Sequence, residues 1–363
     1  MDRLPKTYLQ MQLSKLAWIV MFWLIIAIGE FFFEYEVLIN HGNVPDSFPF
    51  WRYFFSHLIS VFIGGLIGGS IMVFYLEKWF REHSYGQAML LVFVQYTLIS
   101  MIVAYFGFGF LYKYELQQSF FSPAVQDEIW GYLISLDYLK NFFLWLMITF
   151  ISIAALLIND KYGPGVLKDF LLGKYFHPTR EERIFMFLDL RNSTQIAEKL
   201  GEAAYFNFLK DLFKDSTVPI INSRGEIYQY VGDEIVVTWK MERGLKNANC
   251  VRCFFDIQEA IRKRNKYYQK TYGYQPEFKA GFHYGHVMTG EIGVVKRDII
   301  FSGDVLNTAS RIQGKCNDFG VNILLSKYLI DKLSLPPNTL QPAKIGELQL
   351  RGKQKYVALY TIQ

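Results

Sequence analysis

Two aspartates in the second half of the sequence stand where a folded chain could hold divalent cations. Asp189 lies at the end of the apolar run 184–190, which has the length and flanks of a buried strand, and Asp233 follows Gly232 in a turn between two short apolar segments. Carboxylate oxygens are preferred ligands of hard divalent cations, and such cations bind nucleotide phosphates. A Gly-Asp pair alone is ordinary turn chemistry, so a second motif is needed before either residue indicates a metal site.

The segment 302–311, with the sequence SGDVLNTASR, supplies that second motif. It opens a predicted helix and places Asn307 and Arg311 four residues apart, which is one turn along the same helix face. An amide at this position is suited to orienting a ribose oxygen, and a guanidinium is suited to balancing charge on a phosphoryl group in transfer. The two motifs together indicate chemistry on a nucleoside triphosphate.

The sequence resembles the catalytic domain of class III nucleotidyl cyclases, the adenylate and guanylate cyclase family, over about residues 180–362. Five blocks follow one another in the order that the family shows: FLDLRNST, YQYVGDEIV, FKAGFHYGHVMTGEIG, FSGDVLNTASR and LRGKQK. One block alone would be a weak signal, whereas five in order are specific. The resemblance implies a βαββαβ-type core that acts as a head-to-tail homodimer with composite active sites in the interface. The arrangement also looks like that of four-span bacterial cyclases.

The resemblance implies metal-binding and phosphate-binding roles for particular residues. Asp189 and Asp233 match the family's two metal-binding aspartates, which implies two Mg²⁺ or Mn²⁺ ions per active site. The backbone that follows, beginning at Leu190, would wrap the triphosphate and contribute to the metal site. Lys279 falls where the family often has a phosphate-binding Arg, and Lys353 falls where it has a phosphate-binding Lys.

The catalytic pair matches the family, but the base-reading positions do not. Asn307 and Arg311 match the transition-state pair, which the other subunit would supply. The family's adenine-reading Lys is Gln229 here, and its Asp or Thr partner aligns with Ile300, next to Phe301. Gln229 can exchange hydrogen bonds with a base edge, whereas Ile300 offers only packing. We expect ATP because it is the family's commonest substrate, while GTP and the pyrimidine triphosphates stay open.

The function implied by the resemblance is a membrane-bound adenylate cyclase, a lyase that forms 3′,5′-cyclic AMP and pyrophosphate for second-messenger signalling. Two alternatives stay open. The string VGDEI also resembles the GGDEF signature of diguanylate cyclases, although that family lacks the NTASR block. A non-enzymatic alternative is a receptor-like protein that uses a degenerate cyclase domain for dimerisation.

The expected elements of the catalytic domain alternate between strands and helices, without a Gly-rich dinucleotide turn, so a Rossmann fold is disfavoured. We expect helices at 193–210, continuing towards 221, and at 245–268 and 305–318. The expected strands are 184–190, 226–230, 235–240, 278–284, about 286–292 and 321–325, followed by a hairpin across Gly352. His283 and His286 are expected to flank a turn between the two middle strands.

The first half of the sequence has the apolar composition of a membrane domain. The chain has 363 residues, of which 52% are hydrophobic. A transmembrane helix needs about 20 apolar residues, and four stretches qualify, at about 16–33, 54–76, 88–111 and 141–158. The first is too long for a signal peptide. The expected fold is therefore a multi-pass α-helical membrane domain at 1–158, a linker at 159–179 and an α/β catalytic domain, an α+β sandwich, at 180–363.

Basic residues predict the orientation of these stretches. Arg3, Lys6 and Lys15 precede the first stretch, Lys78 and Arg81 lie between the second and third, and more basic residues follow the fourth. Both termini and the catalytic domain are therefore expected on the cytoplasmic side of the inner (plasma) membrane. In the second stretch, overlapping GxxxG steps at 64–69 indicate either a packing or dimer seam or ordinary membrane-helix glycines.

The distribution of charges and cysteines argues against a disulfide framework and against a nucleic-acid partner. Before Asn159 there are 8 basic and 11 acidic residues, so the positive excess of the chain lies in the second half. Cys250, Cys253 and Cys316 are too few for a disulfide framework, and the first two are expected to be buried thiols. The basic run 262–266 is most simply a solvated helix end, so we expect no nucleic-acid partner.

Overall fold

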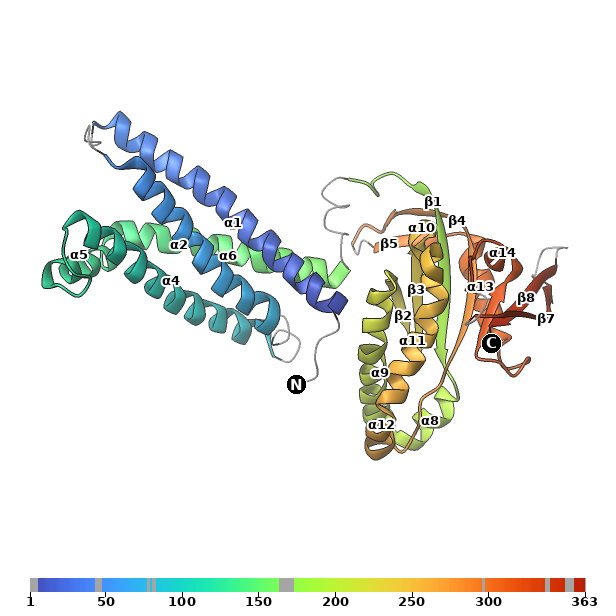
Figure 1. Ribbon diagram of the computed structural model, residues 1–363. Helices are drawn as coiled ribbons and strands as arrows, with labels where there is room; N and C mark the ends of the chain where they lie inside the picture. Colours follow the sequence, from blue (N-terminus) through green and yellow to red (C-terminus); the bar gives the residue numbers. More distant parts are fainter. Residues whose placement is uncertain are drawn as a thin grey trace. The chain divides into compact units, whose positions relative to one another are not determined.

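The computed structural model describes residues 6–42, 48–76, 79, 83–162, 173–295, 298–336, 340–349 and 356–362. The chain divides into two compact units, residues 9–164 and residues 165–363 together with 1–8 (Figure 1). Each unit is described by itself. Residues 163–172 of the expected linker, and Lys353, lie outside the described part.

Five α-helices and a π-helical turn make up the described part of the first unit. They are α1 (Lys6–Asn40), α2 (Phe50–Ile71), η1 (Met72–Leu76), α4 (Tyr85–Glu115), α5 (Pro123–Leu133) and α6 (Leu136–Tyr162). Among the described residues, four helical segments are long and apolar enough to cross a membrane: Leu9–Asn40, Phe50–Leu76, Tyr85–Glu115 and Leu136–Asn159. Each contains one of the expected stretches. α5 is only 11 residues long, too short to span a bilayer.

Glycines of α2 let this helix approach α1 closely. Gly65 and Gly69 are buried. A Cβ added to Gly69 would lie 2.8 Å from Leu16 Cδ1, and one added to Gly65 would lie 3.5 Å from Trp23. Small residues that bring two helix backbones together are a common means of packing in membranes. The GxxxG pattern therefore forms a packing seam within the chain.

Eight strands in the described part of the second unit form one sheet in the order β2-β3-β1-β4-β6-β8-β7, with β5 paired to β4. All neighbours are antiparallel except β4 and β6. The strands are β1 (Thr179–Leu190), β2 (Glu226–Val231), β3 (Glu234–Lys240), β4 (Phe278–Ile292), β5 (Asp298–Ser302), β6 (Ile323–Ser326), β7 (Pro342–Gln349) and β8 (Tyr356–Ile362).

The two faces of the sheet are covered by different helices. These are α8 (Ser193–Leu200), α9 (Glu202–Asn222), α10 (Met241–Leu245), η2 (Lys246–Ala248), α11 (Asn249–Lys263), α12 (Asn265–Tyr272), α13 (Asp304–Gly314) and α14 (Lys327–Ile330). Ile184, Met186 and Leu188 of β1 point into the main core with residues of α8, α9 and α11, and Figure 1 shows α9 and α11 side by side. Phe185 and Phe187 alternate with them and pack against α13. This α/β arrangement is the predicted class.

Glycines in β4 allow α13 to lie directly on the sheet. A Cβ on Gly281 would lie 2.2 Å from the backbone nitrogen of Gln313, and one on Gly285 would lie 2.7 Å from Val305 Cγ2. Real Cβ atoms do not approach other atoms so closely, so a larger residue would push the helix away. The position of α13 therefore depends on these two glycines.

Three sequence predictions about this unit are wrong. The helix expected at 245–268 is divided into η2, α11 and α12, with a break at Arg264. β4 runs unbroken over 15 residues, so His283 and His286 lie inside one strand and flank no turn. The helix expected at 193–221 breaks at Gly201, which has a φ of +74°, into α8 and α9. Glycine is the residue that most readily takes a positive φ, so Gly201 can end one helix and begin the next inside an otherwise helical pattern.

Candidate active site

Asp189 is held from two sides, by β4 and by α13. Its neighbour across the β1–β4 ladder is Lys279, and the Lys279 ammonium lies 3.0 Å from Asp189 Oδ2. Gln313 of α13 donates a hydrogen bond from Nε2 to the same oxygen at 2.8 Å. Antiparallel pairing fixes the first contact, because directly opposed residues bring their side chains together. The second depends on the close approach of α13 to β4.

Asp233 lies beside Asp189 because their strands are neighbours. It occupies the turn between β2 and β3 after Gly232, whose φ of +60° suits glycine. β3 pairs with β1, with Ile235 opposite Leu188. The Asp233 carboxyl lies close to the Asp189 carboxyl and to the Ser193 hydroxyl. Its Oδ2 is buried and has no hydrogen-bond partner among the described residues.

The site concentrates negative charge in a partly buried place. Burial raises the pKa of Asp233, and the adjacent Asp189 carboxylate raises it further, against the opposing hydrogen bond from Ser193. Burial also raises the pKa of Glu234 to about 7, with smaller contributions from Asp189 and Asp233, while Lys279 acts in the opposite direction. Ionised carboxylates so placed repel one another unless a cation lies near them.

The donor set fits a hard divalent cation. Two carboxylates converge, and one of their oxygens is buried without a donor. Among the described residues, no group of three or more His, Cys, Asp or Glu side chains is arranged to hold a metal ion. Mg²⁺ is commonly bound by one or two carboxylates, with water and substrate phosphates completing its shell. Asp189 and Asp233 therefore suit a metal that is bound together with a nucleotide.

The backbone after Asp189 turns sharply and is anchored. The Leu190 side chain is buried in the core, so only its backbone could face the site. Arg191 donates hydrogen bonds to Asn322 Oδ1 at 2.7 Å and to the Val321 carbonyl at 2.6 Å. Asn192 has a φ of +56° and precedes the first turn of α8. Asn tolerates this conformation better than most residues, which explains its place in the turn.

Asn307 and Arg311 lie on the outer side of α13. Both side chains are exposed, whereas Val305, Ala309 and Gln313 on the same helix are buried. At 100° per residue, Arg311 is about 200° around the helix from Gln313. The structure thus joins Asp189, Asp233 and Lys279 in one site and places the predicted transition-state pair on the helix surface that faces away from Asp189.

The three candidate base-reading residues lie on β2 and β5. Gln229 is exposed, and Ile300 is half-buried opposite Gly290 of β4. Phe301 has its ring 4.9 Å from that of Tyr228 and 5.5 Å from that of Phe185, measured between centroids. Phe301 therefore serves first as a packing residue between β5 and the sheet.

Sequence reasoning missed Gln313, Ser193 and Arg191. The sequence places Gln313 two residues after Arg311, but nothing local indicates that it contacts Asp189. Ser193 follows the DLRN turn directly, and a hydroxyl so close to a predicted metal ligand is a signal that could have been used. Arg191 is adjacent to the same turn.

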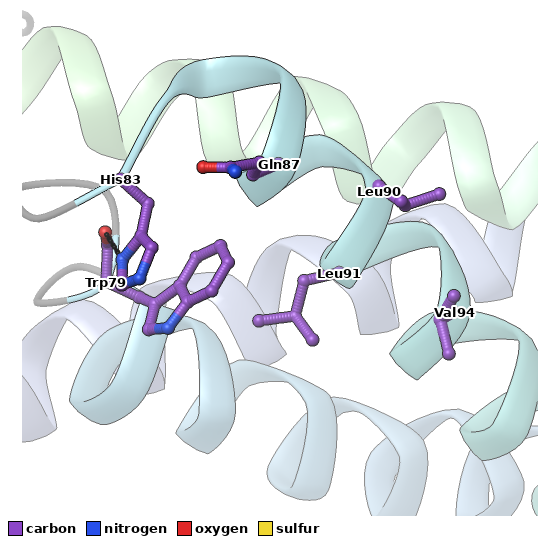
Figure 2. Close-up of a pocket in the computed structure, with 6 residues that line it drawn as sticks. All are labelled: Trp79, His83, Gln87, Leu90, Leu91 and Val94. Carbon is purple, nitrogen blue, oxygen red and sulfur yellow. Dashed lines mark hydrogen bonds between the residues drawn. The ribbon is translucent and has the colours of Figure 1, made fainter.

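Described residues of the first unit line apolar hollows, of which two are the most distinct. One of about 360 Å³ is lined by Trp79, His83, Gln87, Leu90, Leu91 and Val94. Figure 2 shows the His83 ring against the Trp79 ring, with centroids 3.8 Å apart. A larger one of about 610 Å³ lies between α2 and α4. Neither includes a residue of the acidic site.

A sheet that brings two aspartates together, with an Asn/Arg helix packed on one face, fits a catalytic domain that binds a metal and a phosphorylated substrate. Residues 177–363 match the family model described as the adenylate and guanylate cyclase catalytic domain. The chain belongs to this family. The match decides against the diguanylate cyclase alternative.

Named relatives and a solved structure agree with this assignment. The chain is 35% identical over 210 residues to adenylate cyclase 2 of Rhizobium meliloti (strain 1021), covering 58% of each chain. It is 28% identical over 184 residues to an adenylate cyclase of Anabaena cylindrica, covering 49% of this chain and 36% of that protein. A bacterial light-regulated adenylyl cyclase shares the fold with a TM-score of 0.52 and 18% identity, covering 60% of this chain and 63% of that one. The chain thus covers less than two thirds of each of these proteins.

Proposed function

We propose that this protein is a membrane-bound adenylate cyclase, a phosphorus–oxygen lyase that converts ATP to 3′,5′-cyclic AMP and pyrophosphate for second-messenger signalling. The observation that carries the proposal is the convergence of Asp189 and Asp233, with Lys279 beside them, in a domain of the cyclase family. Gln229 and Ile300 match neither the adenine-reading nor the guanine-reading pair. The support for ATP as substrate therefore comes from the names of the two bacterial relatives.

Asp189 and Asp233 would hold two Mg²⁺ or Mn²⁺ ions. Such a bound cation supplies positive charge that lowers the pKa of the ribose 3′-hydroxyl and balances the triphosphate. The chain itself orients its two carboxylates through Lys279, Gln313 and Ser193. Lys279 adds a positive charge near the phosphates, and Lys353 is proposed to do the same. No covalent intermediate with the protein is needed.

The active site would be completed by a second copy of the chain. Asn307 and Arg311 are exposed on α13, on the side of the helix that faces away from Asp189 of their own chain. In a head-to-tail homodimer these side chains could reach the partner's acidic site. Asn307 would then orient a ribose oxygen, and Arg311 would balance charge on the phosphoryl group in transfer.

The four apolar helices would anchor the enzyme in the inner membrane, with both termini and the catalytic domain in the cytoplasm. The basic residues beside their expected cytoplasmic ends support this orientation. The same proposal includes domain boundaries at 158 and 180. It also includes contact with the lipid bilayer and no nucleic-acid partner.

A substrate panel on the purified full-length protein tests the function. The protein would be incubated with Mg²⁺ or Mn²⁺ and each of ATP, GTP, CTP and UTP, and cyclic products would be identified by mass spectrometry. Cyclic AMP from ATP is expected. A different cyclic nucleotide as the main product would overturn the assignment of ATP, and no cyclic product from any triphosphate would leave the degenerate, receptor-like alternative.

A further inference from the structure

We propose that α13 works in two active sites of the dimer at once. Its outer face would complete the partner's site through Asn307 and Arg311, while its inner face positions Asp189 of its own site through Gln313. This inference rests on the proposed function. Gln313 is a positioning residue, because it acts on the metal site only through Asp189.

The inner contact is buried and specific. Gln313 is only 6% exposed, and its amide donates to Asp189 Oδ2 at 2.8 Å while Lys279 contacts the same oxygen at 3.0 Å. Two donors on Oδ2 hold the carboxyl group in one orientation, and neither of them contacts Oδ1. Partners that orient a metal ligand in this way contribute strongly to metal affinity.

The backbone of α13 cannot shift without moving Gln313. A Cβ on Gly281 would lie 2.2 Å from the Gln313 nitrogen and 2.6 Å from the Ala309 carbonyl oxygen, so helix and strand backbones are in direct contact. Farther along, the Cys316 thiol lies 3.5 Å from the Ala280 carbonyl oxygen. These contacts are made by the two residues that follow Lys279, the other partner of Asp189. A displacement of the helix would therefore reach the carboxylate through the Gln313 amide.

The outer face of the same rigid segment carries the residues proposed to act in the partner. Arg311 precedes Gln313 by two residues and points about 200° away from it. One helical turn therefore joins a side chain of one active site to a side chain of the other. Metal binding at Asp189 and docking of Arg311 into the partner's site would then be linked through the position of α13.

Mixed dimers of full-length protein separate the two roles. A chain with Arg311→Ala is combined with a chain with Asp233→Ala, so that the one competent site takes its acids from the first chain and its Asn307 and Arg311 from the second. Gln313→Met, which keeps the side-chain length and removes the amide, is then added to either chain. The measured quantity is the Mn²⁺ concentration that gives half-maximal activity.

We expect this concentration to rise about tenfold or more when Gln313→Met is on the chain that supplies Asp189. A much smaller rise is expected when the change is on the other chain. A general loss of folding affects both arrangements alike, so it cannot produce this difference. Equal shifts in the two arrangements, or no shift in either, would overturn the inference.

A second measurement does not depend on activity. Mn²⁺ binding to the Gln313→Met homodimer in the presence of a non-cyclisable ATP analogue, followed by electron paramagnetic resonance of free Mn²⁺, should be weakened about tenfold or more relative to wild type. Unchanged affinity would refute the role of Gln313 even if the mixed dimers are active. Weakened affinity without activity in any mixed dimer would leave Gln313 as a positioning residue but refute both the shared site and the double role of α13.

Discussion

Asp233 keeps one carboxylate oxygen buried without a hydrogen bond from any described donor, next to a second acid. In a protein that binds no cation, such a residue only costs stability, because burial and a like charge both disfavour its ionised form. The same surroundings become favourable when a divalent cation is bound. The residue is thus suited to binding and poorly suited to holding the fold together.

Replacing this acid should separate activity from stability. We expect Asp233→Asn to lower cyclase activity about a hundredfold or more, because an oxygen ligand loses its charge. In EDTA, the melting temperature should stay the same or rise, since a buried charge has been removed. Differential scanning fluorimetry of both proteins measures this. A lower melting temperature of the variant in EDTA would mean that Asp233 instead stabilises the fold.

The three cysteines should be inert in the native protein. Cys250, Cys253 and Cys316 are fully buried, and burial raises the pKa of each thiol to about 12. The reactive thiolate is therefore scarce until the pH approaches 12. At pH 8, iodoacetamide should modify none of them in folded protein and all three in denaturant, as measured by intact mass. Rapid modification of the native protein would contradict this expectation.

At the scale of elements, the catalytic unit depends on how closely α13 and β4 pack. Gly281 and Gly285 lie on the same face of β4, four residues apart, and each meets the helix. Lys279 and Gln313 can both contact Asp189 only while α13 stays this close to β4. The packing of two elements therefore sets the geometry of one carboxylate.

Enlarging one of these glycines should disturb both stability and metal use. We expect Gly281→Ala to lower the free energy of unfolding by about 1–3 kcal/mol through overpacking, and to raise the Mn²⁺ requirement. Gly314→Ala, at the end of α13, is the matched control, because a Cβ there meets nothing within 4 Å. Its melting temperature should equal or slightly exceed that of wild type. Similar losses in both variants would argue against a special role for the β4 contact.

Elements with a regular hydrophobic pattern could be predicted from the sequence. The positions of the candidate site residues on those elements could be predicted as well. The apolar run around Leu188 predicted β1, and the spacing of Asn307 and Arg311 predicted one face of α13. The unbroken β4 was missed because Gly285 suggested a turn, whereas it makes room for Val305. The Gln313–Asp189 contact joins residues 124 positions apart. Such a contact depends on packing between elements, which no local pattern contains.

At the scale of the whole molecule, the chain combines two surfaces suited to different solvents. α1, α2, α4 and α6 expose large apolar side chains along their length, such as Trp18, Ile59 and Leu98. The sheet of the second unit instead buries its apolar residues between helices. Exposed apolar helices suit a bilayer, where every backbone amide is satisfied within the helix.

Labelling tests the proposed orientation in the membrane. Gln118, between α4 and α5, and Lys332, after α14, are both exposed. In spheroplasts, a membrane-impermeant maleimide should label Gln118→Cys but not Lys332→Cys, while lysed cells should allow labelling of both. The buried native cysteines give little background. Labelling of Lys332→Cys in intact spheroplasts would reverse the topology.

The unbroken course of β4 also constrains how the gene can change. Inserting one residue between Ala280 and Tyr284 would turn Lys279 to the opposite face of the sheet, away from Asp189, because side chains alternate along a strand. Val294 and Val295, after the strand, are fully exposed and have no such restriction. In descendants of this sequence we therefore expect insertions and deletions to accumulate after Ile292 and to be purged from the strand itself, so a correct alignment of functional relatives should run through 279–290 without a gap.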